Sequence, residues 1–217
     1  MDKLRPILEK VKEVFPESDH TNMFGTFRDI AKKTVDELRE MKELGVKMIV
    51  AGLESGSDAV LSEMNIGYTA DEAIAAGQKM NEAGIGLGTG VIIGLGGVKH
   101  SEEHIKGSIR VLNSFSSTHV GMTVYTPYRD APLFADIQSG AFELPTYEQI
   151  FREEAEIVQG LDFKEPCVFS TGYYYPNNHI VAGQLPSEKD RVLREVKSRV
   201  STYPHWLDKK IQIGGHM

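Results

Sequence analysis

Two apolar runs, each associated with a glycine-rich turn, constrain the fold of this chain more than any other feature. The first run, 47–53, leads into Glu54-Ser-Gly-Ser57, and the second, 90–95, follows a ladder of alternate glycines. Between them, a capping box at 69–72 opens a helix that ends at Gly84. Continuous apolar runs are typical of strands covered on both faces in a parallel sheet. Because ligands bind at the carboxyl ends of parallel strands, the two turns predict one shared binding site.

The same alternation of strand and helix continues along the chain. Further apolar runs at 22–27 and 119–125 are expected strands, the first of them weaker. Helices are predicted after the polar starts at Thr34, Thr69, Ser101, Thr146 and Ser187. This order predicts an α/β fold of βα units with right-handed crossovers. Beyond residue 140 the rhythm changes, and we expect residues 141–217 to form a helical and irregular C-terminal extension packed on the same domain.

The charge balance and the cysteine count exclude several classes of protein. With 24 basic and 31 acidic residues the net charge is −7, whereas dedicated nucleic-acid binders carry a basic excess. No apolar run reaches the about 18 residues of a membrane span, and the N-terminus lacks the apolar segment of a signal peptide. A single cysteine, Cys167, excludes an intramolecular disulfide and a multi-cysteine metal site within the chain. We therefore expect a cytoplasmic protein.

The turn after the first run has two interpretations that the residues alone leave open. In one, Glu54 accepts hydrogen bonds from the hydroxyls of a ribose; in the other, the turn only joins strand to helix, with Ser57 as the N-cap. A serine-hydrolase elbow is excluded, because Ser55 lacks the two flanking glycines that it requires. The glycine ladder at 84–90 contains no Gly-x-Gly-x-x-Gly window, so a dinucleotide-binding fingerprint is not favoured either.

Two further groups of residues are candidate sites, a pair of histidines and an aromatic stretch. His100 and His104 have a spacing that can bind zinc on a helix, but a helix that starts at Ser101 leaves His100 outside it. A solvated helix start is the better account of these histidines. The aromatic stretch 173–179 either lines a substrate pocket or closes the mouth of a barrel, and the sequence does not separate these alternatives.

Three spaced motifs agree in order with one known family. They are the turn segment 52–61, the Gly-x-Ile-x-Gly pattern at 90–94, and the segment 125–133 followed by Gly140. On these motifs the chain resembles the radical S-adenosylmethionine (radical SAM) superfamily, in the branch of oxygen-independent coproporphyrinogen III oxidase and the Elongator catalytic subunit. The resemblance implies that residues 1–140 form a partial TIM-like barrel of parallel strands, about strands three to six of the family's barrel.

The resemblance also implies a cofactor and the residues that hold it. S-adenosylmethionine would be held at its ribose by Glu54 and Ser55, and at its adenine by Gly90, Ile92 and Gly94. The intact enzyme would cleave this cofactor reductively and abstract a hydrogen atom from a substrate. This sequence does not identify that substrate.

Two departures from the family pattern shape the expected function. The Cys-x-x-x-Cys-x-x-Cys motif that holds a [4Fe–4S] cluster is absent, and cluster ligation needs several thiolates. Ile66 stands where relatives often carry Lys or Arg as a partner of the methionyl carboxylate. We therefore expect the C-terminal portion of a radical SAM enzyme, inactive alone, with the cluster present only in a full-length form.

Two alternatives to this function stay open. The first is a non-enzymatic α/β module that binds a nucleoside or takes part in assembly. The second is an ordinary barrel enzyme whose catalytic carboxylates the motifs do not mark.

The run 22–27 also predicts a partner. In the family's barrel this strand would be interior, whereas here its neighbour on one side would be missing. An N-terminal helix can cover apolar surface but cannot supply strand hydrogen bonds, and its apolar face consists of Leu4, Ile7, Leu8 and Val11. Because an unpaired sheet edge recruits another chain, we expect a homodimer through this edge, and neither a membrane nor a dedicated nucleic-acid partner.

Overall fold

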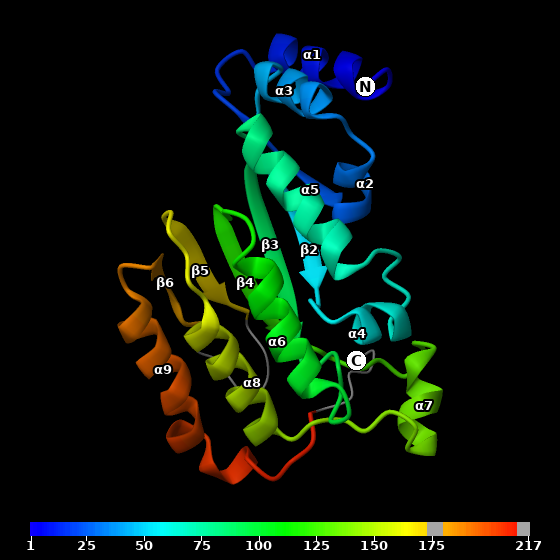
Figure 1. The fold of residues 1–217 in the computed structure, drawn as a ribbon, viewed down its shortest axis with the longest axis vertical. Coiled ribbons are helices and arrows are strands. Elements are labelled where there is room, and N and C mark those ends of the chain that lie inside the picture. Colours follow the sequence, from blue (N-terminus) through cyan, green and yellow to red (C-terminus); the bar gives the residue numbers. More distant parts are fainter. Residues whose placement is uncertain (173–179, 212–217) are drawn as a thin grey trace.

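The computed structural model describes residues 1–172 and 180–211, so the aromatic stretch 173–179 lies outside the described residues. One six-stranded sheet has the order β1-β2-β3-β4-β5-β6 (Figure 1). Its strands are β1 Thr21–Thr26, β2 Val46–Glu54, β3 Gly86–Ile93, β4 His119–Val124, β5 Cys167–Thr171 and β6 Ala182–Leu185. Neighbours from β1 to β5 pair in parallel, and β6 is antiparallel to β5. The expected α/β fold with a partial barrel of parallel strands is confirmed.

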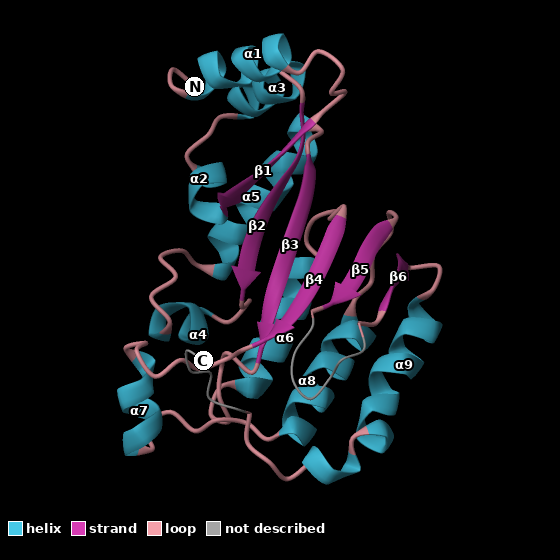
Figure 2. Cartoon of the chain, turned by 180° about the vertical axis from the view of Figure 1, so that it is seen from behind, coloured by secondary structure: helices cyan, strands magenta, loops and turns pink. Residues whose placement is uncertain are grey.

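Helices cover one face of this sheet. The helices of the described residues are α1 Leu4–Val14, α2 Phe27–Ala31, α3 Val35–Glu43, α4 Asp58–Glu63, α5 Ala70–Ala83, α6 Ser101–Leu112, α7 Leu133–Ser139, α8 Tyr147–Gly160 and α9 Lys189–Thr202, followed by a 3-10 turn, Pro204–Trp206, and α1 and α7 lie beyond the ends of the sheet. Seen from behind, the sheet stands in front of α5, α6, α8 and α9, and no described helix crosses its other face (Figure 2). Across the described residues, none of the helices has the length and apolar character needed to cross a membrane.

Capping explains where several of these helices begin. Thr34, Thr69 and Thr146 each form the expected capping box, in which the threonine hydroxyl accepts the backbone N–H of N3 and the threonine's backbone N–H donates to the side chain at N3. Ser101 differs from its expected role as an N-cap. It is the first residue of α6, and its hydroxyl donates to a buried carboxylate of α8 instead.

Side chains of the strands alternate between the helix-covered face and an open face. On β2, Ile49, Ala51 and Leu53 are buried, whereas the alternate residues Val50 and Gly52 are only half-buried. The prediction that both faces are covered is therefore wrong for the described residues, because the helices pack on one face. On the open face, the paired Gly52, Gly90 and Gly121 form a row across β2, β3 and β4. This row leaves a strip of the sheet without side chains.

The segment 141–217 contributes strands as well as helices. Besides α8 and α9, it supplies β5 and β6, and β5 extends the parallel sheet beside β4. Helix α9 begins at Lys189, just after the expected start at Ser187. The sheet therefore runs through both parts of the chain.

Strand β1 lies at one edge of the sheet, where the run 22–27 is expected to lack a neighbour. Phe24 on this strand is 89% exposed. Together with Met23, Leu38 and Met41 it lines an apolar cavity of about 150 Å³. Among the described residues no strand pairs with the outer side of β1, so its backbone groups there face away from the sheet. Such an edge is a template for pairing with another chain.

We propose that two copies of the chain associate through this edge about a twofold axis, burying more than about 1,000 Å². We expect Phe24→Glu to convert the dimer to a monomer, because a charge on an edge strand opposes pairing. Sedimentation equilibrium at micromolar concentration measures the change. Val200→Glu, at an exposed apolar position on α9, is the control and should remain a dimer. A wild-type chain that sediments as a monomer contradicts the proposal.

Candidate functional site

Glu54 is held over the carboxyl end of β2 by its backbone. Its φ is 60°, in the left-handed region, and a Cβ at Gly52 would overlap its carboxyl group. The hydroxyl of Tyr68 donates to the carbonyl oxygens of Gly52 and Leu53, at 2.9 and 3.1 Å. Burial raises the pKa of Glu54, and burial followed by the charge of Glu54 raises the pKa of Tyr68. The carboxyl group is thus a half-buried acceptor beside a fixed phenol.

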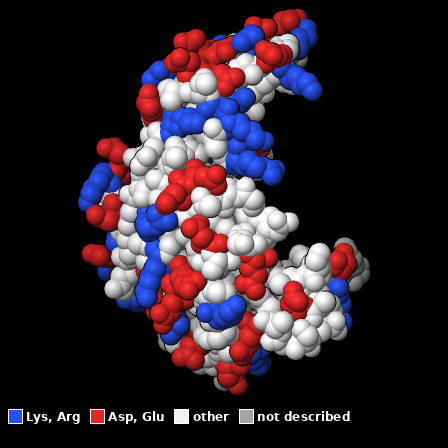
Figure 3. Space-filling view, turned by 45° about the vertical axis from the view of Figure 1, so that its right-hand side comes forward, with Lys and Arg blue, Asp and Glu red and all other residues white. Residues whose placement is uncertain are grey.

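A cavity of about 150 Å³ opens beside this carboxyl group. It lies at the ends of β1 and β2, and its walls include Thr26, Arg28, Glu54, Ile66 and Tyr68. Arg28 belongs to α2, a region where basic side chains gather beside the hollow of the molecule (Figure 3). Arg28 thereby brings a positive charge to the cavity whose wall at Ile66 is apolar.

Ser55 does not lie where its expected role as a ribose-binding residue would place it. Its side chain is fully buried. Its Oγ accepts the N–H of Ser57 at 3.0 Å and is hydrogen-bonded to Nδ1 of His104 at 2.8 Å. Ser57 caps α4 by accepting the N–H of Val60 at 3.4 Å. The two interpretations of this turn therefore apply to different residues, since Glu54 faces the cavity while the serines fix the backbone.

The end of β3 places the three expected adenine residues in two environments. Gly90 and Ile92 are half-buried on the open face of the sheet. A Cβ at Gly90 would meet, among described residues, only the carbonyl oxygen of Gly121 at 3.5 Å, so the space above it is open to a ligand. Gly94 lies beyond the strand with a φ of 81° and donates its N–H to the buried Glu153 at 2.5 Å. Gly90 and Ile92 therefore lie on the open face of the sheet, and Gly94 does not.

A buried polar cluster lies beneath these two strand ends. Glu153 accepts the hydroxyl of Ser101 at 2.6 Å through Oε2, and its Oε1 is 3.4 Å from Nε2 of His104. Burial raises the pKa of Glu153 to about 7, partly offset by the hydrogen bonds from Ser101 and Gly94. Burial lowers the pKa of His104 to about 4. At neutral pH His104 is uncharged and Glu153 lies near the midpoint of its titration.

The paired histidines do not share a site. His100 lies at the start of α6, 3.1 Å from Glu103 and 3.7 Å from Glu63, whereas His104 points into the interior. In the part of the chain that the structure describes, no group of three or more His, Cys, Asp or Glu is placed to hold a metal ion. Cys167 is buried in β5, and burial raises the pKa of its thiol to about 12.

Sequence reasoning missed Arg28, Tyr68 and Glu153. Glu153 does carry a signal, because it stands three residues after Ile150 and four before Ile157, on the face of α8 that must be buried. Arg28 and Tyr68 reach the cavity from α2 and from the loop before α5, so no local pattern marks them.

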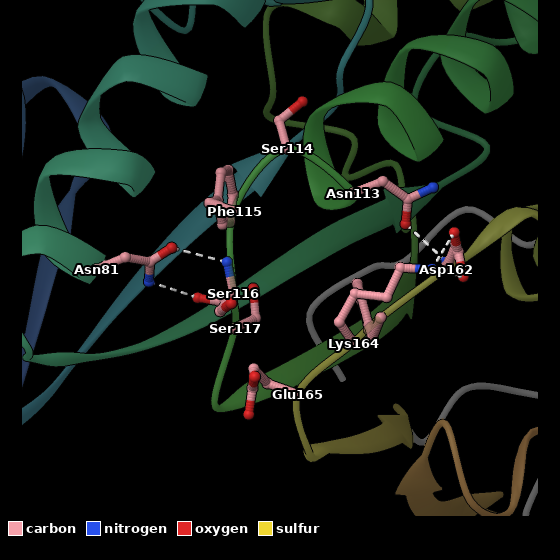
Figure 4. Close-up of a pocket in the computed structure, with 10 residues that line it drawn as sticks. Asn81, Asn113, Ser114, Phe115, Ser116, Ser117, Asp162, Lys164 and Glu165 are labelled. Atoms are coloured by element: carbon pink, nitrogen blue, oxygen red, sulfur yellow. Dashed lines mark hydrogen bonds and ion pairs between the residues drawn. The ribbon is translucent and has the colours of Figure 1, made fainter.

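A second cavity, of about 270 Å³, lies at the amino ends of the strands (Figure 4). The amide of Asn81 donates to the carbonyl of Ser116 at 2.8 Å and accepts its N–H at 2.7 Å. Asn113 accepts the N–H of Asp162 at 2.8 Å. These asparagines are engaged in fixing the two loops that form the cavity. Because ligands of parallel sheets bind at carboxyl ends, we place the candidate site at the opposite end.

Comparison with known proteins adds a family and a fold. The family model described as the radical SAM superfamily matches residues 4–110. An archaeal Elp3 from Methanocaldococcus infernus with an N-terminal deletion has a similar structure, with a TM-score of 0.55 and 11% identity, over 90% of this chain and 43% of that chain. Methylornithine synthase (PylB) reaches a TM-score of 0.49 at 14% identity, over 94% and 63%. No curated protein matched the sequence. The chain thus spans less than half of the Elp3 chain, and at these identities the likeness is one of fold.

The raised pKa of Glu153 predicts how stability changes with pH. The folded protein holds this proton up to about pH 7, whereas the unfolded chain releases it near the ordinary value of 4.5. The stabilising contribution is therefore complete at acid pH and is lost as the pH rises through 7, by about 3 kcal/mol at most. Glu153→Gln does not titrate. We expect the free energy of unfolding of the wild type to fall relative to that of Glu153→Gln between pH 5 and pH 8.

Urea denaturation at each pH measures this difference. The groups around Glu153, namely His104, Ser101, Arg152 and Glu156, are present in both proteins, so their contributions to the free energy of unfolding largely cancel. Glu156→Gln, on the exposed side of α8, is the matched control and should track the wild type at every pH. A constant difference between wild type and Glu153→Gln would show that Glu153 is ionised throughout.

Proposed function

We propose that this chain, which belongs over residues 4–110 to the radical SAM superfamily, is the cofactor-orienting C-terminal portion of a radical SAM iron–sulfur enzyme. The observation that carries the proposal is the carboxyl group of Glu54, fixed over Gly52 beside a cavity and next to the open backbone at Gly90. S-adenosylmethionine, when bound, supplies reductive cleavage and the abstraction of a hydrogen atom from a substrate. The residues of this chain hold and orient its nucleoside.

The residues at the two strand ends fit the nucleoside part of this cofactor. An ionised Glu54 can accept hydrogen bonds from the two neighbouring hydroxyls of a ribose. Ile92 offers an apolar contact to a flat base, and Gly90 lets the base approach the backbone. Arg28 offers a positive charge to the methionyl carboxylate in the cavity where Ile66 offers none. Ser55 acts by fixing the turn, because its side chain is buried.

The same residues do not fit an iron–sulfur cluster. The chain has one cysteine, Cys167, whose thiol is buried and has a raised pKa. A four-iron cluster requires several thiolates. The cluster of the proposed enzyme must therefore come from residues outside this sequence. We place the enzyme in the cytoplasm as part of the proposal, because a single free thiol fits a reducing compartment.

A non-enzymatic nucleoside-binding or assembly module is the second candidate. The observation that favours it is the retention of a fixed acceptor at Glu54 in a chain without cluster ligands. The coding sequence upstream of Met1 separates the two candidates. A Cys-x-x-x-Cys-x-x-Cys motif in frame supports the enzyme, and an in-frame stop directly before Met1 supports the module.

Nucleoside binding tests the site itself. We expect 5′-deoxyadenosine and S-adenosylhomocysteine to bind the chain, and Glu54→Gln to weaken both about tenfold or more, because one charge-assisted hydrogen bond is worth about 1.5–3 kcal/mol. Isothermal titration calorimetry measures the affinities. Glu102→Gln, an exposed carboxylate on α6, is the control and should bind as the wild type does. Equal binding by wild type and Glu54→Gln would remove Glu54 from the site.

Iron reconstitution tests the assignment of the cluster to other residues. We expect anaerobic treatment with iron and sulfide to leave the chain colourless, because a lone buried thiol cannot hold four irons. Cys167→Ser should behave identically. Iron analysis that finds four irons per monomer would overturn the assignment.

A further inference from the structure

The two strand-end turns of the proposed site are joined underneath by one chain of buried polar contacts. It starts at the N–H of Gly94, passes through Glu153 and His104, and reaches Ser55, which accepts the N–H of Ser57. Three of the links are hydrogen bonds of 2.5, 2.8 and 3.0 Å, whereas Oε1 of Glu153 and Nε2 of His104 are 3.4 Å apart and form a polar contact without a hydrogen bond. The side chains of Glu153, His104 and Ser55 are at most 1% exposed. The turn after β2 and the turn after β3 are thus connected through α8 and α6.

One end of this chain of contacts holds backbone that needs support. Glu54, directly before Ser55, has a φ of 60°, whereas Gly94, with a φ of 81°, is a glycine and adopts this conformation without strain. A non-glycine residue in the left-handed region costs free energy and persists only where its surroundings hold it. A carboxyl group and an imidazole also lose solvation when they are buried at helix positions that apolar residues normally occupy. A simple packing role would not require either group.

Helix α6 packs tightly against the turn after β2. A Cβ at Gly56 or at Gly107 would overlap the backbone of the other residue, so the turn and the helix are in direct contact. The N–H of Gly56 also donates to Oγ of Ser108, at 3.1 Å. A displacement of His104 on this helix must therefore reach the turn that carries Glu54.

We propose that Glu153 and His104 are positioning residues, which couple the turn after β2 to the turn after β3 so that Glu54 and Ile92 keep one fixed spacing for a nucleoside. The inference rests on the proposed function and adds to it two residues that do not touch the ligand. Glu153 acts through Gly94, and His104 acts through Ser55.

Amide hydrogen exchange followed by NMR tests the coupling without any ligand. In Glu153→Ala we expect the amides of Gly94 and of Ser57 to exchange about tenfold faster or more, as for the loss of one buried hydrogen bond. In His104→Ala we expect the same two amides to respond. Glu153→Gln should restore most of the protection, because its carbonyl oxygen still accepts from Gly94. Acceleration of Gly94 alone in the first variant, and of Ser57 alone in the second, would overturn the proposal.

Two further variants serve as a surface control and as a substitute for Glu153→Ala in the exchange experiment. Glu156→Ala, on the exposed side of α8, should leave both amides unchanged, and amides of the central strand β4 serve as reference in every variant. Ser101→Ala removes one hydrogen bond from Glu153 and keeps its carboxyl group. If Glu153→Ala does not fold, Ser101→Ala should show the paired acceleration at smaller amplitude, and protection unchanged at both amides would count against the coupling.

Nucleoside affinity then separates this inference from the function on which it rests. If the wild type binds 5′-deoxyadenosine, we expect Glu153→Ala to bind at least about tenfold more weakly and Glu153→Gln to recover most of the loss. Binding by Glu153→Ala as tight as by the wild type would refute positioning and leave the proposed function intact. If the wild type binds no nucleoside, the proposed function fails, and the exchange experiment still decides whether the two turns are coupled.

Discussion

The parallel pairing of β2 with β3 is the constraint on which the candidate site depends. Its register sets Gly52 beside Gly90 and then shifts between Gly52 and Glu54. At this shift the backbone of Glu54 enters the left-handed region, and its side chain turns back over Gly52. Any larger residue at position 52 would occupy the space of the carboxyl group. Gly52 is therefore needed for the space it leaves for the carboxyl group of Glu54, and not for the flexibility of its backbone. Gly90 has the complementary role, since it leaves the neighbouring backbone open to a ligand.

Two adjacent glutamates of α8 show two ways of burying a carboxyl group. Glu154 forms an ion pair with the buried Arg199 of α9, and Arg199 also donates to Thr171 at the end of β5. Removing one partner of this ion pair would leave an uncompensated charge in the core. Burial raises the pKa of Glu153, whose carboxyl group accepts hydrogen bonds from a hydroxyl and a backbone N–H and lies beside a neutral imidazole. One helix thus anchors the C-terminal strands through an ion pair and the turn after β3 through a hydrogen bond.

The sequence predicts the elements well because their signals are local. Capping boxes at Thr34, Thr69 and Thr146 mark helix starts, and the runs at 47–53 and 119–125 coincide with β2 and β4. The turn after the first run predicts Glu54 at the carboxyl end of a strand, where the cavity lies, and the family resemblance assigns Gly90 to a backbone that a ligand can approach. What the sequence misses depends on contacts between distant segments. Ser55 is buried against His104, which is forty-nine residues away in the sequence. One face of the sheet is exposed because the helices pack on the other face.

The open face links the proposed chemistry to the proposed association. A site that generates reactive species must keep water away from the reacting atoms. In the described residues the helices cover one side of the sheet, and the side that carries Gly90 and Ile92 is crossed by none of them. In the proposed enzyme the described residues would fix the position of a nucleoside, and a further surface would shield it from water. The unpaired edge of β1, with Phe24 exposed, lies next to β2, whose end carries Glu54. A strand added at that edge would extend the sheet toward closure on the side where the cavity lies, so that positioning and shielding are supplied by separate surfaces.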